Sequence, residues 1–202
     1  SPVPPEWDLA YFSTESDLGK LYLRWMKLAM DFAEENRNQM MEKVLDIVRL
    51  WVKKYAGINH FKLSDAVHCH HNYAALEEHY GKEVWVHRKG AIRAGVGEMG
   101  IIPGAMGTYS YLVKGKGNPE SFLSCSHGAG RRMSRLYARE QFSVQDTILD
   151  LRELGVFLAK AKRTDVGTES RFAYKAIDFV LSQELDLVEP VRRLKTVAVV
   201  KG

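Results

Sequence analysis

Glycine is distributed unevenly along this chain. Eleven of its 16 glycines fall between Gly81 and Gly130, although that segment holds only 50 of the 202 residues. Glycine destabilises helices and permits turns and close backbone contacts, so the segment is predicted to form short strands joined by loops. Loops of this kind let backbone N–H groups approach a ligand, and we therefore expect the functional site here.

Helical patterns flank the glycine-rich segment. Before it, apolar residues recur at three- and four-residue steps from Leu18 to Tyr55, behind a capping pattern at Thr14 and Asp17. They predict one long helix or two abutting helices that end near Gly57. Further helices are expected over 131–141, from Ser143 and over 172–187, and strands over 83–86, 109–113, 121–123 and 196–200. The predicted fold class is α+β, a mixed β-rich, glycine-loop core flanked by helices.

The domain organisation is predicted to be a single unit over residues 1–202. It has a helical lead-in at 1–57, a β- and loop-rich site region at 58–130, and helices with a C-terminal strand at 131–202. With 46% hydrophobic and 27% charged residues, the composition excludes a disordered chain. No apolar run approaches about 20 residues and no charged leader opens the chain, which argues against a membrane-spanning or secreted protein. Two cysteines are too few for a disulfide scaffold, so a cytoplasmic location is expected.

Positive charge is concentrated in the middle of the chain. The formal net charge is +4, but residues 81–140 carry ten Lys or Arg against four Glu, a net of +6. A concentrated basic stripe suits a phosphate-bearing partner, through Coulomb attraction and counterion release. The alternative is a solvated basic face with no partner.

Histidine is clustered as well. Six of the seven histidines lie between His60 and His87, and three of them surround Cys69 in the run His68-Cys-His-His71. Imidazole and thiolate bind borderline transition metals, so the run suggests a metal site. If the run is a strand, alternate side chains point to opposite faces and at most two can reach one ion. Either at least one of these histidines is a ligand, or all of them are structural.

The seventh histidine, His127, stands in Ser126-His-Gly-Ala-Gly130, before basic residues and a helical pattern. This places an imidazole at a glycine turn beside a helix N-terminus, where free N–H groups suit a phosphate. An imidazole with an ordinary pKa near ~6.5 is largely neutral at pH 7. It can act as a general base, attack phosphorus itself, or merely cap a tight turn.

A second glycine motif runs Gly100-Ile-Ile-Pro-Gly-Ala-Met-Gly107 and is followed by Thr108-Tyr-Ser110. It lacks the Lys-Ser/Thr ending of a Walker A loop and the spacing of a dinucleotide fingerprint. It therefore offers exposed backbone donors and a hydroxyl, or it is only a turn between two strands.

Six ordered blocks together resemble the RtcB family of RNA-splicing ligases. The blocks are Cys69-His-His-Asn-Tyr-Ala74, His87-Arg-Lys-Gly-Ala91, Gly100 to Gly107, Ser124-Cys-Ser-His-Gly-Ala-Gly-Arg131 with Met133-Ser-Arg135, Ala173-Tyr-Lys175 and Val200-Lys-Gly202. The resemblance covers most of the chain, which looks like the C-terminal half of such a ligase.

This resemblance implies a reaction. The family joins an RNA end bearing a 2′,3′-cyclic phosphate or 3′-phosphate to a 5′-hydroxyl end, using GTP and Mn²⁺. By resemblance, His127 would attack the α-phosphorus of GTP and form a histidine–GMP intermediate. GMP would then pass to the RNA 3′-phosphate and be displaced by the 5′-hydroxyl. The expected partner is RNA, as tRNA halves or another cleaved RNA.

The resemblance also implies roles for single residues. His71 matches the family's manganese ligand, whereas His68 and His70 do not, and Lys89 and Arg131 are expected to hold the RNA phosphate. Tyr174 would lie against the guanine. The other positions that match guanylate contacts are Asn72, Pro103, Gly104, Ala105, Met106, Ser110, Gly128, Ala129, Gly130 and Lys201. Ala105 stands where many relatives carry serine, which removes a hydroxyl contact but leaves the backbone donors.

The family's other metal ligands lie in Asp-x-Gly-Cys-Gly, Gly-Asn-His-Phe and His-Ser-Gly-Ser-Arg-Gly segments, which these 202 residues lack. We therefore expect an N-terminal half, upstream of Ser1 or as a separate polypeptide, to be needed for catalysis, and an archease-type activator is a further candidate partner. The start at Ser1 fits truncation or processing. Two alternatives stay open: a metal-dependent RNA phosphoesterase or nuclease with His127 as acid or base, and a non-catalytic RNA-binding remnant.

Overall fold

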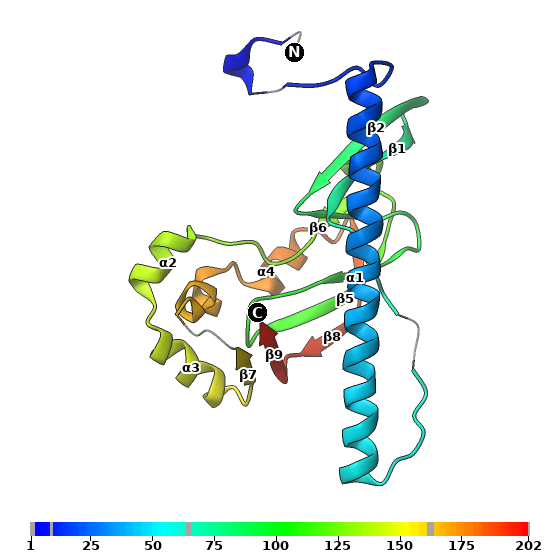
Figure 1. The fold of residues 1–202 in the computed structure, drawn as a ribbon. Coiled ribbons are helices and arrows are strands. Elements are labelled where there is room, and N and C mark those ends of the chain that lie inside the picture. Colours follow the sequence, from blue (N-terminus) through cyan, green and yellow to red (C-terminus); the bar gives the residue numbers. More distant parts are fainter. Residues whose placement is uncertain (1–2, 9, 64–65, 161–163, 202) are drawn as a thin grey trace. The chain divides into compact units, whose positions relative to one another are not determined.

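The computed structural model describes residues 3–8, 10–63, 66–160 and 164–201 (Figure 1). Contacts group the chain into two compact units, Ser1–Asp65 and Ala66–Gly202, and each is described by itself. The sequence-based organisation as one unit over 1–202 stays a prediction beside this grouping. Within the described ranges, no helix combines the length and the apolar character needed to cross a membrane.

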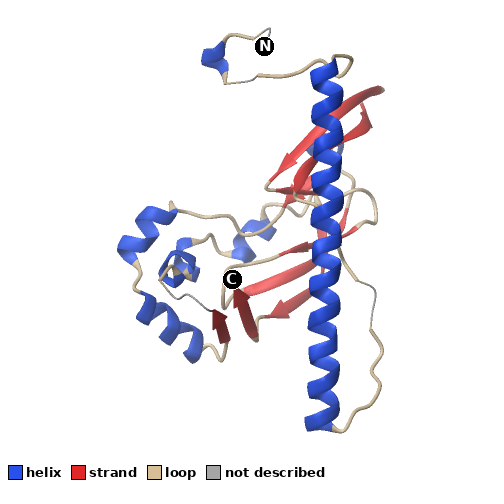
Figure 2. Cartoon of the chain, in the orientation of Figure 1, coloured by secondary structure: helices blue, strands red, loops and turns tan. Residues whose placement is uncertain are grey.

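The first unit is built around α1 (Asp17–Ala56), one continuous helix of 40 residues that follows the short 3-10 helix η1 (Pro5–Trp7) (Figure 2). The single-helix alternative is therefore confirmed. Its N-cap is Ser16, whose Oγ accepts a hydrogen bond from the Gly19 N–H at 3.0 Å, rather than the predicted Thr14. The helix ends at Gly57, where a φ of +67° stops it as the sequence predicts.

The second unit contains small, mostly antiparallel sheets. Strands β1 (Asn72–His79) and β2 (Lys82–Lys89) form a hairpin, of which the sequence predicts only residues 83–86. Its two-residue turn, Tyr80 and Gly81, has φ of +53° and +72°, the backbone that matches strand twist in tight hairpins. The remaining strands pair as β3 (Ala91–Arg93) with β6 (Ser124–Ser126), β4 (Met99–Ile102) with β5 (Tyr109–Gly115) and β5 with β8 (Val188–Lys195), and β7 (Phe157–Lys160) in parallel with β9 (Ala198–Lys201).

The strand predicted over 121–123 is wrong. Residues Pro119–Ser121 form the 3-10 helix η2, and Phe122 and Leu123 then take φ of +52° and +51°, so the extended backbone of β6 begins only at Ser124. The Leu123 N–H donates to the Asn118 carbonyl oxygen at 3.0 Å and closes this turn. The N–H groups of Phe122 and Leu123 are thus bonded within the turn and both residues have positive φ, so they do not form an extended strand.

The helices agree with the sequence only in part. Helix α2 (Arg135–Gln141) starts four residues later than predicted, because the Ser134 Oγ caps it by accepting from the Tyr137 N–H. Helix α3 (Val144–Glu153) starts after Ser143 as predicted. The helix predicted over 172–187 is wrong in length: only α4 (Ile177–Ser182) forms, because Tyr174 is extended and bridges to Arg131. Two 3-10 turns, η3 (Val166–Glu169) and η4 (Arg171–Ala173), precede it.

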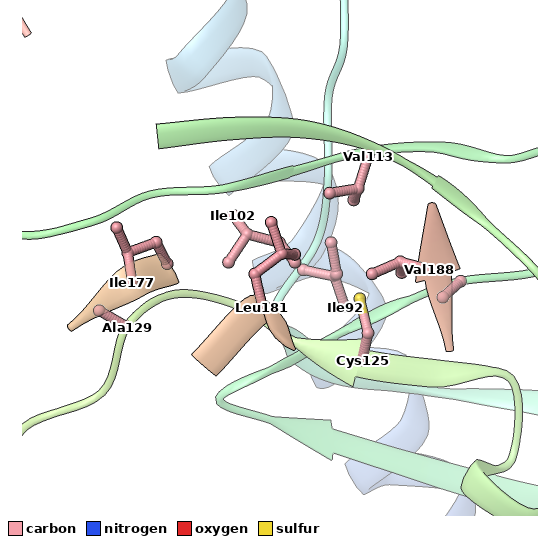
Figure 3. Packing of buried hydrophobic residues seen from close by; sticks show 9 residues of the cluster. Ile92, Ile102, Val113, Cys125, Ala129, Ile177, Leu181 and Val188 are labelled. Carbon is pink, nitrogen blue, oxygen red and sulfur yellow. The ribbon is translucent and has the colours of Figure 1, made fainter. Parts of the chain in front are cut away.

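The main core of this unit lies beneath the glycine-rich loops. Figure 3 shows Ile102, Val113 and Leu181 packed together. Cys125 lies in the same cluster, where burial raises the pKa of its thiol to about 12, so it is a protonated core residue. A second cluster gathers side chains from the 103–108 loop, α3 and the segments that follow it: Met106, Ile148, Leu151, Val156 and Val166. The α+β class with a β-rich, glycine-loop core is therefore confirmed.

Candidate functional site

His127 follows β6 directly and lies beside His71, which precedes β1. The two imidazole rings stack with centroids 5.4 Å apart and planes only 10° from parallel. Gly90 links them through its backbone: its N–H donates to the His71 carbonyl oxygen at 3.0 Å, and its own carbonyl oxygen accepts from the His127 N–H at 3.4 Å. The glycine that follows β2 therefore links the two histidines through its backbone.

The environment of His127 favours its neutral form. Burial, together with the charge of the neighbouring His71, lowers the pKa of His127 below its ordinary value. A neutral imidazole keeps a nitrogen lone pair, which is what a nucleophile or general base needs near pH 7.

A cavity of about 280 Å³ lies where the 103–110 segment meets the C-terminal strand β9. Six of the residues predicted to contact a guanylate line it: Gly104, Ala105, Met106, Ser110, Tyr174 and Lys201. Three more lining residues, Glu169, Thr196 and Val199, are absent from the prediction. Segments distant in sequence thus bring these six predicted nucleotide contacts to one place.

The turn after His127 is joined to the wall of this cavity. The Ala129 N–H donates to the Pro103 carbonyl oxygen at 3.0 Å. A Cβ on Gly128 would lie only 3.1 Å from the same oxygen, so glycine lets the two segments cross closely. Gly130 continues the contact, because its carbonyl oxygen accepts from the Lys175 N–H beside Tyr174.

The sequence of this unit, and of the helix before it, matches a known family over almost its whole length. The profile described as tRNA-splicing ligase RtcB matches residues 3–202. The chain belongs to the RtcB family. The RtcB-like arrangement that the sequence predicts is therefore correct at the level of the family.

Individual relatives agree with this assignment. The chain is 42% identical over 198 residues to the RNA-splicing ligase RtcB of Escherichia coli, with 98% of this chain and 48% of the relative covered. It is 36% identical over 225 residues to the tRNA-splicing ligase RtcB of Nanoarchaeum equitans, and 33% over 219 residues to that of Thermococcus kodakarensis. The chain thus spans about half the length of these RtcB relatives.

The two cations that the RtcB resemblance assigns to the RNA phosphate differ in their surroundings. Lys89 is exposed at the end of β2, directly before Gly90 and opposite Asn72 in the hairpin register. Arg131 is partly buried, and its guanidinium donates to the carbonyl oxygens of Met133 and Thr168 and to the Tyr174 hydroxyl. A guanidinium has five N–H donors; three of them make these bonds, and Nη1 of Arg131 also lies 3.6 Å from the Glu169 carboxylate.

The histidine run before β1 does not form a metal cluster by itself. Residues 66–71 are irregular, so the strand geometry considered for His68 to His71 does not apply. The His68 and His70 rings contact each other with centroids 5.7 Å apart, and His70 contacts Tyr73 at 5.6 Å, whereas His71 stacks on His127. Among the described residues, no group of three or more His, Cys, Asp or Glu side chains is placed to hold a metal ion.

Glu169 is the charged site residue that sequence reasoning missed. Burial alone would raise the pKa of its carboxyl, but hydrogen bonds from Lys201 and Tyr174 and the charges of Lys201 and Arg131 outweigh burial and lower it. The carboxylate is therefore ionised at neutral pH. Tyr174 behaves in the opposite way: burial and Glu169 raise the pKa of its hydroxyl, which stays protonated and donates to the carboxylate at 2.7 Å.

Proposed function

We propose that this chain is the part of an RNA-splicing ligase that carries the guanylylated histidine, with His127 as the nucleophile. The observation that carries the proposal is the placement of a neutral His127 one short turn from the cavity that six predicted nucleotide contacts line. Family membership and the names of the relatives support it. The reaction would join an RNA 2′,3′-cyclic phosphate or 3′-phosphate to a 5′-hydroxyl end.

The first step would form a bond between His127 and the α-phosphorus of GTP. A ring nitrogen donates its lone pair to phosphorus, the bond to the pyrophosphate oxygen breaks, and pyrophosphate leaves with that electron pair. The ring nitrogen that does not attack keeps its proton until the adduct has formed and then releases it to water. Because no proton has to leave before attack, the lowered pKa of His127 is sufficient activation.

The surrounding residues would hold GTP and RNA in place. The backbone at 104–107 and at Gly128 and Gly130 would offer N–H donors to the phosphates, while Tyr174 and Lys201 would contact the base. Lys89 and Arg131 would hold the RNA 3′-phosphate, which receives GMP before the 5′-hydroxyl displaces it.

Manganese dependence requires residues beyond this chain. His71 would supply one ligand, but the described residues build no group of three, so the chain alone does not fit a catalytic metal site. When bound, Mn²⁺ would neutralise charge on the phosphates. We propose that the remaining ligands come from the half of the RtcB relatives that this chain does not match, and that RNA and an archease-type activator are further partners.

The test is adduct formation with α-labelled GTP and Mn²⁺. The chain is incubated alone and with a polypeptide corresponding to the unmatched half of the E. coli relative. We expect an acid-labile adduct of one GMP in the mixture, absent from the His127→Ala variant and retained in the His87→Ala variant, which alters an exposed imidazole on β2. Labelling of another residue, or phosphate release from RNA ends without GTP, would contradict the proposal and favour a phosphoesterase.

A further inference from the structure

Glu169 lines the cavity and contacts the side chains of Tyr174, Lys201, Arg131 and Arg135. Its Oε2 accepts from the Tyr174 hydroxyl at 2.7 Å and from the Lys201 ammonium at 2.8 Å. Its Oε1 lies 3.6 Å from the guanidinium groups of both Arg131 and Arg135. One carboxylate therefore connects Tyr174 and Lys201, which line the cavity, with the two arginines.

The geometry leaves Glu169 well shielded and its partners less so. Its side chain is 16% exposed, while that of Lys201 is 33% exposed. Lys201 lies at the end of β9, which pairs with β7 and packs its Val199 against the second core cluster. A lysine side chain at such a position is flexible, so the hydrogen bond to Glu169 is what aims the ammonium at the cavity.

Glu169 also sets the orientation of Tyr174. The Tyr174 hydroxyl donates to Glu169 and accepts from Arg131 at 3.0 Å, and the Arg131 guanidinium lies 4.8 Å from the centroid of the tyrosine ring. The ring is therefore held at its hydroxyl end and against one face. That leaves it fixed as a wall of the cavity rather than free to rotate.

We propose that Glu169 is a positioning residue for base selection, which acts by aiming Lys201 and fixing Tyr174. This inference rests on the proposed function, because it takes the occupant of the cavity to be a purine nucleotide. An ammonium group only donates hydrogen bonds, and after bonding Glu169 it has two donors left for the cavity. Guanine presents an acceptor oxygen at position 6, whereas adenine presents a donor amino group there.

A fixed Lys201 therefore favours guanine over adenine. The preference depends on the negative charge of Glu169, because a neutral amide at this position holds an ammonium more weakly than a carboxylate does. Substituting Glu169 should thus reduce discrimination between the bases, and not only affinity. Loss of discrimination is a result that a purely structural role of Glu169 would not produce.

The experiment measures equilibrium binding of GTP and of ATP to the full chain by calorimetry. The Glu169→Gln variant is expected to bind GTP roughly tenfold more weakly, as one lost charge-assisted hydrogen bond implies, with its preference for GTP over ATP falling toward one. The Glu169→Asp variant should keep part of the preference, because it keeps the charge. The control Glu153→Gln alters an exposed carboxylate on α3 and should behave as the wild type.

A double-mutant cycle with Lys201→Ala tests whether Glu169 acts through Lys201. If it does, Glu169→Gln adds little to the loss of preference that Lys201→Ala already causes. Thermal unfolding of each variant separates misfolding from a binding effect, and the Glu169→Asp variant carries the test if Glu169→Gln fails to fold. A wild-type preference for GTP that survives Glu169→Gln, or that the two substitutions reduce additively, overturns this inference alone. A wild type that does not prefer GTP overturns the proposed function as well.

Discussion

Gly90 controls the space beside the Nε2 atom of His127. Its φ is +71°, and a Cβ there would lie 3.4 Å from that nitrogen. Gly155 offers a matched control, since its φ is +70° but a Cβ would meet nothing within 4 Å. Both Gly90→Ala and Gly155→Ala place alanine in a left-handed conformation, which costs about 1–2 kcal/mol.

We expect the two variants to lose similar stability but to differ at His127. In Gly90→Ala the added methyl group reduces the access of water to the imidazole, and the pKa of His127 falls further below its ordinary value. In Gly155→Ala that pKa is unchanged. An NMR pH titration of the histidine ring nitrogens measures the difference, and equal pKa values of His127 in the two variants would refute the role of Gly90.

At the level of residues, the sequence predicts a site residue only where that residue belongs to a short recognisable motif. His127, Gly104, Tyr174 and Lys201 belong to motifs that resemble a known family, and the last three meet at one cavity. Glu169 belongs to no such motif, and its partner Lys201 lies 32 residues away. Lys201 reaches the carboxylate from β9, a strand that pairs with the distant β7, so no spacing in the sequence could reveal the contact.

Among the elements, the β1–β2 hairpin is anchored by a buried Arg88. Its side chain is 1% exposed and donates to both oxygens of Glu77 on β1, and also to Tyr73. It further donates to the Ser124 hydroxyl and the Phe122 carbonyl oxygen, in and before the strand that leads to His127. Arg88 therefore fixes the hairpin that carries Lys89 against the strand that carries His127.

Removing Arg88 should be costly because it leaves a buried carboxylate behind. We expect Arg88→Met to lower the free energy of unfolding by about 3–5 kcal/mol at pH 7. The control Arg193→Met breaks an exposed pair with Asp178, whose side chains are 49% and 57% exposed, and should cost no more than about 1 kcal/mol. Urea denaturation of the three proteins measures both values.

The effect of Arg88→Met should also depend on pH. Hydrogen bonding from Arg88 lowers the pKa of Glu77 from 4.5 to about 2, so this carboxylate stabilises the folded state above pH 4.5 and loses that contribution as the pH falls toward 2. The difference in stability between wild type and Arg88→Met should therefore shrink over this range. A difference that stays constant from pH 6 to pH 2 would show that Glu77 does not depend on Arg88.

The secondary-structure elements also show why some predictions from sequence succeed and others fail. The long helix α1 is predicted well because its periodic pattern repeats over 40 residues. The strand expected at 121–123 is lost to a tight local turn, in which Leu123 bonds back to Asn118. The helix expected over 172–187 is shortened by a contact between distant segments, since Tyr174 bridges to Arg131, and local propensity does not decide that structure.

For the whole molecule, the concentration of positive charge is smaller than a count of residues 81–140 suggests. Arg88 and Arg131 belong to that segment, but they pair with Glu77 and Glu169, which lie outside it. The cations left exposed near the site, such as Lys89, are therefore fewer than the net of +6 implies. The basic middle segment serves internal pairing as well as attraction of phosphate.

The small number of candidate metal ligands in this chain leads to a prediction for metal binding. A catalytic metal ion normally has several protein ligands, and the described residues offer no group of three. The chain alone should therefore leave the six-line EPR spectrum of aqueous Mn²⁺ at full amplitude. Adding the unmatched half of the E. coli relative should reduce that signal, because His71 then joins ligands from the second polypeptide.

His71 is the residue on which this prediction turns. In the mixture, His71→Ala should restore much of the free Mn²⁺ signal, whereas His60→Ala, which changes a histidine outside the predicted ligand set, should not. His71→Ala removes the imidazole that stacks on His127 as well, so nucleotide binding is measured beside it to separate the two effects. The prediction would be wrong if the chain alone reduced the free Mn²⁺ signal and the His71→Ala variant did not. That result would mean that the chain completes a metal site by itself and needs no second half to bind manganese.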